Sequence, residues 1–362
     1  MTGTMTWAAM DVHARSIHAA SFDVLSGELS RRVFKSGSPD QVVEWLAALP
    51  SPVRACYEAG PTGYGLYRAA TGAGVLCDVI APSKTPRASG EKVKSDGRDT
   101  VHLLRQLMAG ALTPITIPTA SASAEAARDL ARAREQVRGD LMRCRHRLSK
   151  LLLRHGRVFD QSTWTQAHRR WLGAQSFEQV NTELAYLDAI AACEGLEARR
   201  AQLDERLSHV AREEEFWPIV SRLRAVRGID TLSALVIVLE VGDFHRFPRA
   251  TQLGSWLGLV PSRQQSGETD THGPITKTGS RYARRILVEA AWHYLRAPRI
   301  GATLSRRHEG VPDHVLQIAW RAQHRLHRVH TRLRAHRKPP NVVNVACARE
   351  LACFMWAAAT AP

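Results

Sequence analysis

A chain of 362 residues is longer than a single hydrophobic core usually supports, so we expect two or three domains. Hydrophobic residues make up 44% of the chain, which excludes wholesale disorder, and the formal net charge of +16 indicates polyanionic partners such as nucleic acids. The six cysteines include no CxxC pair, so neither a zinc site nor a disulfide framework is indicated. Since neither a signal-peptide pattern nor an apolar run of about 18 residues is evident, we expect a cytoplasmic protein without membrane contact.

Residues 1–118 predict an α/β domain. Within residues 6–36, apolar positions lead into a Ser-Gly turn and a second strand ends near Phe34, which predicts a meander of strands. A helix is expected to begin at Pro39, and strands and helices then alternate toward residue 118. Several strands followed by alternating strands and helices predict a mixed sheet of the ribonuclease-H-like type, flanked by helices.

Four acidic residues in this domain lie where predicted elements end or begin. One follows an apolar strand-like run, one ends the next such run, and two lie three apart at a helix start: Asp11, Glu58, Asp96 and Asp99. Such carboxylates can converge on divalent ions, and two hard cations about 3.5–4 Å apart are the usual apparatus for cutting or joining phosphodiesters. We therefore predict an acidic metal site. Asp78 and Glu91 lie nearby in the sequence but do not fit this pattern.

Residues 119–215 predict two long amphipathic helices. Ser121 or Ser123 can cap the first, and the second is expected over about residues 177–212. They could pair as an antiparallel coiled-coil hairpin or within an oligomer, and an ordinary helical core explains them equally well. The apolar stripe predicted for the second helix comprises Leu184, Leu187, Leu196, Leu203, Leu207 and Val210.

Residues 216–300 predict shorter elements richer in glycine, and residues 301–362 a strongly basic helical region. The glycine turn before a predicted helix at residues 231–241 could offer N–H groups to a phosphate, although simple helix capping is the better explanation. One sign of charge dominates the basic region, which favours contact with nucleic-acid backbones over a merely solvated face. The arginines expected to make this contact are Arg325, Arg328 and Arg332.

Ser266 precedes a glycine in a predicted mobile loop, and Lys277, Arg281 and Arg284 follow it toward the next helix. A serine hydroxyl attacks only when its proton is removed or its geometry is enforced, and cations stabilise the charge on a phosphoryl group in the transition state. This combination suits a phosphoryl-transfer nucleophile. Taken alone, Ser-Gly in a loop is usually only a turn, and Ser262 is the alternative nucleophile.

The order of these features resembles the DEDD-type insertion-sequence transposases, which are serine-dependent, bridge-RNA-guided recombinases of bacterial mobile elements. The resemblance covers most of the chain, up to the helix predicted around residues 287–292, and position 283 departs from it with Ala where the family often has Leu. The motifs that carry it are Asp11, Glu58, Asp96-x-x-Asp99, a long helical spacer, Gly258-Leu259-Val260-Pro261, Ser266-Gly267, Ile275-x-Lys277-x-Gly279 and Arg284.

The resemblance implies a RuvC-like amino-terminal domain that uses its four acidic residues with Mg²⁺. It implies that Ser266, in a carboxyl-terminal transposase domain, attacks DNA at element ends and target. The expected partners are DNA, a structured noncoding RNA and further copies of the chain in a dimer or tetramer.

Two other function classes compete with this interpretation. The first is a Holliday-junction resolvase-type endonuclease, which hydrolyses DNA through a metal-activated water and needs no Ser266. The second is a non-catalytic basic nucleic-acid-binding protein. Clustered carboxylates disfavour that class, because they repel each other and DNA unless a metal neutralises them.

Overall fold

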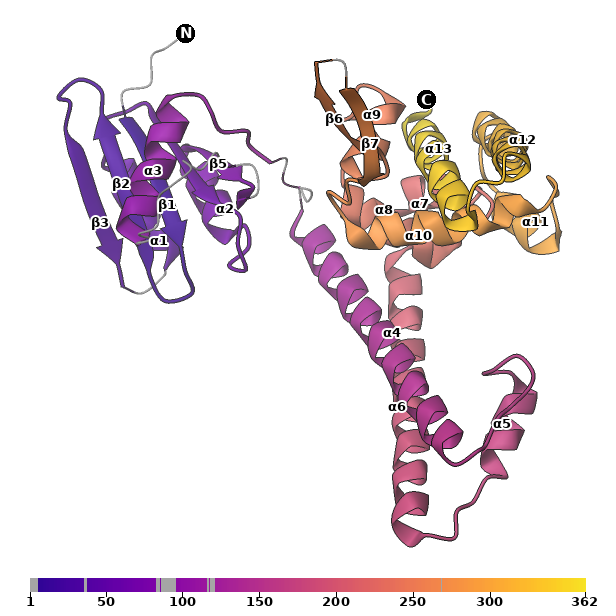
Figure 1. The fold of residues 1–362 in the computed structure, drawn as a ribbon. Coiled ribbons are helices and arrows are strands. Elements are labelled where there is room, and N and C mark those ends of the chain that lie inside the picture. The colour runs from indigo at the N-terminus through magenta and orange to yellow at the C-terminus, as the bar shows by residue number, and fades with distance from the viewer. Residues whose placement is uncertain are drawn as a thin grey trace. The chain divides into compact units, whose positions relative to one another are not determined.

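The computed structural model describes residues 6–35, 38–82, 85, 96–115, 117, 121–267 and 269–362, apart from the side chain of Asp96. The chain forms two compact units, Met1–Ile117 and Pro118–Pro362 (Figure 1). Each of them contains hydrophobic core clusters of its own.

A five-stranded mixed sheet forms the centre of the Met1–Ile117 unit. Its strands are β1 (Thr6–Val12), β2 (Ile17–Asp23), β3 (Leu29–Phe34), β4 (Val53–Glu58) and β5 (Leu76–Ile80). The strand order is β3-β2-β1-β4-β5. β1, β2 and β3 pair antiparallel as a meander, whereas β4 runs parallel to β1 and β5 runs parallel to β4. The predicted mixed α/β arrangement of this region is thus confirmed.

Helices cover both faces of this sheet. They are α1 (Pro39–Ala47), α2 (Gly65–Gly72) and α3 (Asp96–Met108). Because side chains alternate along a strand, Ala8 and Met10 of β1 pack with α1 and α2, whereas Ala9 packs with α3. On β4, Cys56 packs on the α3 side. This alternation determines which face each later residue of β1 and β4 occupies.

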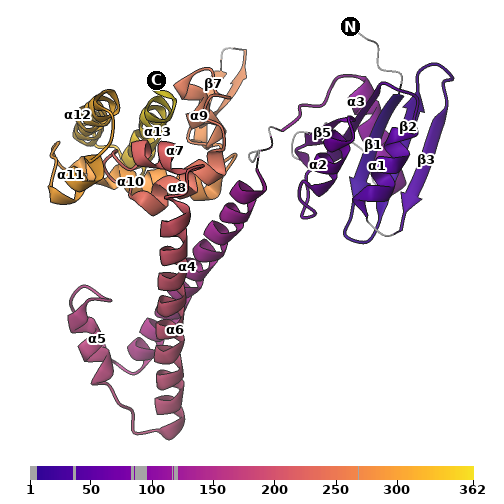
Figure 2. The same ribbon diagram turned by 180° about the vertical axis from the view of Figure 1, so that it is seen from behind.

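Two long helices begin the Pro118–Pro362 unit: α4 (Ala122–Arg154) and α6 (Val180–Val210), connected through α5 (Gln166–Gly173). The Ser121 hydroxyl caps α4 by accepting the Ala124 N–H at 3.0 Å, which confirms one of the two predicted caps. α4 and α6 lie against each other, and α5 lies near the ends of the pair that are far from the helical body (Figure 1, Figure 2).

The apolar stripe predicted on α6 is wrong in its first part. Leu207 is buried as expected, but Leu184 and Leu187 are 59% and 51% exposed. Tyr186 is buried between them, and its hydroxyl donates to the carbonyl oxygen of Leu172 in α5 at 2.6 Å. The connection through α5 packs against this part of α6, in addition to α4. Which α6 side chains are buried therefore depends on two neighbouring segments rather than on one regular helical partner.

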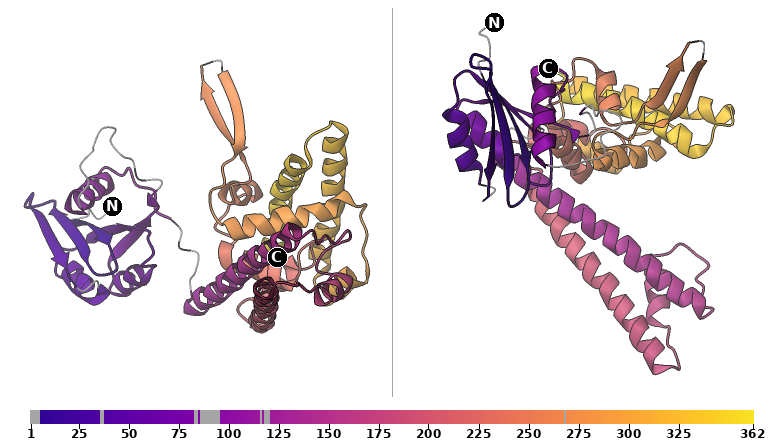
Figure 3. Two further views of the ribbon diagram at one scale, coloured as in Figure 1. Left: turned by 60° about the horizontal axis from the view of Figure 1, so that its bottom comes forward. Right: turned by 60° about the vertical axis from the view of Figure 1, so that its left-hand side comes forward.

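A helical body with one β-hairpin completes this unit (Figure 3). Its elements are α7 (Trp217–Leu223), α8 (Thr231–Val241), α9 (Ala250–Trp256), β6 (Pro261–Ser266), β7 (Thr269–Ile275), α10 (Arg281–Ala291), the short 3₁₀ helix η2 (Trp292–Leu295), α11 (Ala302–His308), α12 (Asp313–Ala335) and α13 (Pro340–Thr360). Among the described residues, α13 alone is long and apolar enough to cross a membrane. Half of its apolar window is buried within the unit, where it packs against α7, α9, α10 and α12.

A tight junction between α9 and α10 anchors the β6–β7 hairpin. Gly258 and Gly279 both have a φ of +66°, and a Cβ on either would collide with backbone atoms across the junction. Arg284 of α10 completes the junction, because its Nη1 donates to the carbonyl oxygens of Leu257 at 2.8 Å and Thr278 at 2.7 Å. Two glycines and one arginine therefore determine where the hairpin leaves the helical body.

We expect Gly279→Ala to lower the free energy of unfolding by about 2–5 kcal/mol, because left-handed strain costs about 1–2 kcal/mol and a backbone collision about 1–3 kcal/mol. Gly310→Ala is the matched control: its φ is +74°, but nothing lies within 4 Å of the added Cβ. Urea unfolding, monitored by tryptophan fluorescence, measures the free energy of unfolding of both variants. Equal losses in the two variants would contradict the collision at the junction.

Candidate functional site

Asp11 and Glu58 lie at the carboxyl ends of neighbouring parallel strands, β1 and β4. The strand register pairs Met10 with Tyr57, the residues immediately before them. Asp11 lies two positions after Ala9, and Glu58 two positions after Cys56, so both carboxylates are on the α3 face of the sheet. Two of the predicted acidic residues thus share one edge and one face.

Asp99 lies in the first turn of α3, which packs on this same face. Trp7 at the start of β1 and Leu107 near the end of α3 line one small cavity. The helix therefore runs antiparallel to β1, and its first turn points toward the strand ends that carry Asp11 and Glu58. The fourth predicted ligand, Asp96, begins α3, but its side chain lies outside the described residues.

The carboxylates at this edge already have polar neighbours. An Asp11 oxygen lies 3.2 Å from His13 Nε2, and Glu58 Oε1 accepts the Thr85 hydroxyl at 2.8 Å. Within the described part of the chain, no three His, Cys, Asp or Glu side chains approach closely enough to hold a metal ion. Asp11, Glu58 and Asp99 therefore lie on the same face of the sheet without forming a metal-binding cluster among the described residues.

The chemistry of the neighbouring groups favours a hard cation at this edge. Carboxylate oxygens are the ligands that Mg²⁺ prefers. Cys56 lies on the same face, but burial raises the pKa of its thiol far above the usual value, so no thiolate is offered to a softer metal. Asp78 of β5 is engaged elsewhere, since its Oδ2 accepts from Arg54 at 2.9 and 3.2 Å. Glu91 lies outside the described residues.

Ser266 is exposed at the end of β6, next to the turn of the β6–β7 hairpin. It is the last residue of β6 and pairs with Thr269, and Gly267 turns the chain with a φ of +56°. The mobile loop predicted here is thus a β-hairpin, because the strands flanking this turn pair with each other. Within the described residues, none of the hydrogen bonds involves the Ser266 hydroxyl, and the side chain is exposed.

Ser262 is less accessible than Ser266. It lies half-buried at an irregularity near the start of β6, where its hydroxyl occupies the space that a Cβ on Gly273 would need. Among the described residues of this hairpin, Asp270 of β7 carries a carboxylate, and Arg263 donates to both its oxygens at 2.8 and 2.9 Å. That pairing lowers the pKa of Asp270 and keeps it from serving as a base near neutral pH.

The three cations predicted beside the serine differ in their surroundings. Lys277 is exposed in the turn after β7, and no described carboxylate pairs with its amine. Arg281 is exposed at the start of α10, where its Nη2 donates to the Tyr282 hydroxyl at 2.8 Å. Arg284 is part of the junction described above, so its guanidinium already serves two carbonyl groups. Lys277 and Arg281 are the accessible members.

The basic region forms an exposed stripe along α12. Arg321, Arg325, Arg328 and Arg332 follow helical spacing on one side and are all exposed. Arg325 is paired with Glu350 of α13 through two hydrogen bonds of 2.8 and 3.1 Å. The other three have no ion-pair partner among the residues described. The stripe therefore offers three uncompensated positive charges.

An aromatic feature of this stripe was not predicted from the sequence. Trp320 is 40% exposed, and its ring lies 4.5 Å from that of His324 in an edge-on arrangement. Their spacing of four residues within a basic helix is the signal that could have identified it. An exposed aromatic ring among cations is a feature of surfaces that bind nucleic acid.

Comparisons with known proteins agree on one family. Residues 220–305, which include the hairpin and its junction, match the model described as "Transposase IS116/IS110/IS902 family". The Sinorhizobium fredii protein y4qE, which is named as a transposase, is 40% identical over 88% of this chain and 78% of its own. The transposase for insertion sequence element IS1533 of Leptospira borgpetersenii is 32% identical over 92% of this chain and 97% of its own. This chain therefore belongs to the IS116/IS110/IS902 family of transposases.

Proposed function

We propose that this transposase moves its insertion sequence by DNA strand transfer through a covalent serine intermediate. In this proposal Asp11, Glu58, Asp96 and Asp99 hold Mg²⁺ in a RuvC-like domain, and Ser266 is the nucleophile. A structured noncoding RNA selects the DNA sites. The observation that carries the metal part is the shared edge and face of Asp11 and Glu58 on adjacent parallel strands.

The RuvC-like assignment draws support from the topology of the Met1–Ile117 unit. An antiparallel meander followed by two parallel strands, in the order β3-β2-β1-β4-β5, is the arrangement expected for a ribonuclease-H-like sheet. Mg²⁺ bound there would neutralise the negative charge of a phosphodiester during cleavage. The role of Asp11 and Glu58 is to bind and orient it, and that of His13 is to hold the Asp11 carboxylate in place.

The serine chemistry is a transesterification. The Ser266 oxygen forms a bond to phosphorus, and the bond from phosphorus to a deoxyribose oxygen breaks. The serine proton passes to a base, and the released deoxyribose oxygen takes up a proton. Attack by another DNA hydroxyl then reverses these changes and joins the strands, so the phosphodiester bond energy is conserved. The exposed hairpin tip supports this role because a duplex can approach it.

Guidance by RNA is supported by charge alone. The chain carries a net charge of +16, and the α12 stripe presents cations at helical spacing. Such a surface suits contact with phosphate backbones, while base pairing between RNA and DNA would supply sequence specificity. The competing function is a hydrolytic nuclease of the resolvase type, which would not need Ser266.

Asp11→Asn should abolish strand transfer, with a loss of at least about a hundredfold, because the neutral amide binds Mg²⁺ poorly. Asp78→Asn is the matched control: it changes a carboxylate of the same sheet that is bound by Arg54. Strand transfer across a Mg²⁺ titration, together with calorimetric Mg²⁺ binding, compares the two. Full activity of Asp11→Asn with unchanged Mg²⁺ dependence would rule out the proposed metal site.

Ser266→Ala should bind DNA normally but form neither a covalent adduct nor a joined product. Ser262→Ala is the control and should retain both. Suicide DNA substrates that trap the adduct, followed by peptide mapping, identify the modified residue. An adduct on Ser262 would transfer the nucleophile role to that residue, and cleavage without any adduct would favour the hydrolytic nuclease.

Replacing Arg328 and Arg332 together with Gln should weaken nucleic-acid binding and flatten its salt dependence. Each lost phosphate contact should reduce the slope of log affinity against log salt by about 0.7–0.9. Arg325→Gln should change the slope less, because Glu350 already compensates that charge. Binding titrations over a range of salt concentrations test this. Equal slopes in the wild type and the double variant would assign the stripe to another role.

A further inference from the structure

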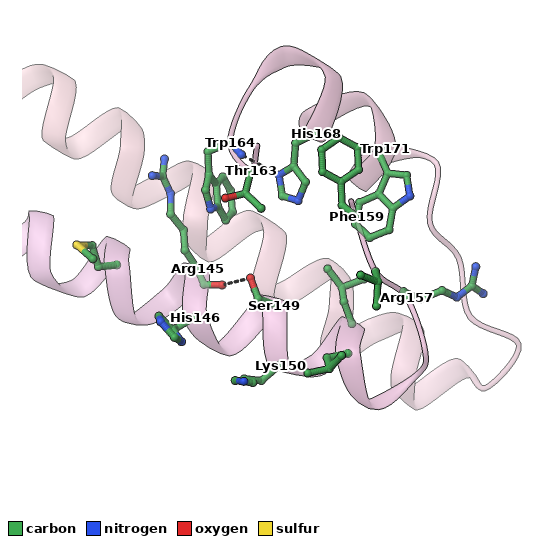
Figure 4. Close-up of a pocket in the computed structure, with 14 residues that line it drawn as sticks. Arg145, His146, Ser149, Lys150, Arg157, Phe159, Thr163, Trp164, His168 and Trp171 are labelled. Carbon is green, nitrogen blue, oxygen red and sulfur yellow. Dashed lines mark hydrogen bonds between the residues drawn. The ribbon is translucent and has the colours of Figure 1, made fainter. Parts of the chain in front are cut away.

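A cavity of about 480 Å³ lies between the last turns of α4 and the connection that leads into α5 (Figure 4). We call it the α4–α5 pocket. Aromatic rings form one side: His168 stacks on Trp171 with ring planes 19° apart and centroids 5.7 Å apart, and Phe159 lies 5.4 Å from Trp171. Trp164 extends the same side, with its ring 5.3 Å from that of His168. The volume lies within the range of small-ligand sites.

The rim of the pocket is positively charged. Its lining includes Arg145, Lys150 and Arg157 and contains no Asp or Glu. The sequence from Leu141 to Phe159 has six Arg and Lys residues and no acidic residue. Arg145 pairs with Glu197, and Arg157 donates to Ser176, but the Lys150 amine has no ion-pair partner among the described residues. A polyanion could therefore replace water around Lys150 without breaking an existing ion pair.

Apolar surface is also left uncovered at the mouth of the pocket. Leu153 and Val158 line it and are 52% and 67% exposed. If the aromatic rings served only to pack α5 on α4, native packing density would leave little space between them. A second copy of this chain would bring the same basic helix toward the pocket, and like charges would oppose that contact. The combination favours an occupant that is flat and apolar in one part and anionic in another.

His168 contributes a polar group to the lining. It is almost fully buried, and burial lowers the pKa of its imidazole, so the ring stays neutral near neutral pH. Its Nδ1 accepts the backbone N–H of Trp164 at 3.1 Å, which leaves the proton on Nε2. The lining thus combines aromatic faces with a neutral imidazole N–H in addition to its cationic side chains.

We infer that the α4–α5 pocket binds an unpaired base of single-stranded RNA, with the base stacked on the aromatic rings and its phosphates next to Lys150 and Arg154. Arg154 is exposed and lies with Lys150 around a neighbouring hollow on the same helix. The inference rests on the proposed RNA partner. Loops and bulges of a folded RNA present unstacked bases, whereas duplex DNA keeps its bases paired and stacked. Stacking on aromatic side chains tolerates any base, which suits a structural contact.

The first test measures binding of a short oligouridylate, of the same strand in a duplex with oligoadenylate, and of oligothymidylate. Trp171→Leu keeps an apolar side chain but removes the aromatic face. It should weaken oligouridylate binding by about 5- to 150-fold, the effect of losing one base–aromatic stack, and leave the duplex unchanged. Trp292→Leu, which alters a 46% exposed tryptophan outside the pocket, is the matched control and should have no effect.

A second variant distinguishes loss of RNA contact from misfolding of α5. Val158→Glu changes a mainly exposed side chain, so the fold should persist, and its carboxylate should repel the bound phosphates. It should weaken oligouridylate binding without changing the molecular mass in solution. A change of mass with unchanged RNA affinity would assign the pocket to contact between copies of the chain and overturn the inference.

Photo-crosslinking locates the contact directly. An oligouridylate containing 4-thiouridine should crosslink to the peptide that spans Phe159 to Trp171. Crosslinks elsewhere, unchanged affinity of Trp171→Leu, or tighter binding of oligothymidylate than of oligouridylate would each overturn the inference. Wild-type protein that binds no RNA at all would instead refute the RNA part of the proposed function. Loss of RNA binding in Ser266→Ala is not expected, so failures of the two proposals can be distinguished.

Discussion

The parallel pairing of β1 with β4 is the interaction on which the candidate metal site depends. It aligns Met10 with Tyr57, so the next residues of both strands, Asp11 and Glu58, leave the sheet at the same edge. Strand alternation then turns both carboxylates toward α3, whose first turn carries Asp99. A shift of one residue in this register would place one carboxylate on the opposite face and separate the pair.

The same sheet shows how position along a strand changes the role of a carboxylate. Asp78 lies beside Cys56 in the register, two residues before the end of β5, and there it pairs with Arg54. Asp11 and Glu58 lie beyond the buried part of the sheet, where Asp11 lies 3.2 Å from His13 and Glu58 accepts the Thr85 hydroxyl. Carboxylates that lie close together repel each other, and in the proposed function a bound cation would relieve that repulsion.

The helical body positions the candidate nucleophile, whereas activation of its hydroxyl requires a further group. Gly258, Gly279 and Arg284 determine how the β6–β7 hairpin leaves α9 and α10, because backbone atoms there approach too closely for any side chain. The hairpin then carries Ser266 to an exposed tip. Asp270, on the described part of the hairpin, is paired with Arg263. A serine hydroxyl attacks only when its proton is removed, so the proposed mechanism requires a group that accepts the Ser266 proton.

Sequence patterns alone determined the element types and many of the boundaries. Apolar runs predicted the strands that end near Asp11 and Glu58, capping chemistry predicted Ser121 or Ser123 at the start of α4, and the helix over residues 231–241 was predicted from its apolar residues. These features follow from local rules, in which a residue responds to its neighbours in the chain. The order of motifs also indicated the transposase family that the comparisons show.

Only the tertiary structure decided which side chains share an environment. The exposure of Leu184 and Leu187, the pairing of Arg325 with Glu350, and the use of Arg284 as an anchor all depend on segments distant in sequence. The α4–α5 pocket likewise exists only because a connection folds back onto α4. Burial, ion pairing and cavities arise from contacts between such segments, and a one-dimensional pattern carries no record of them.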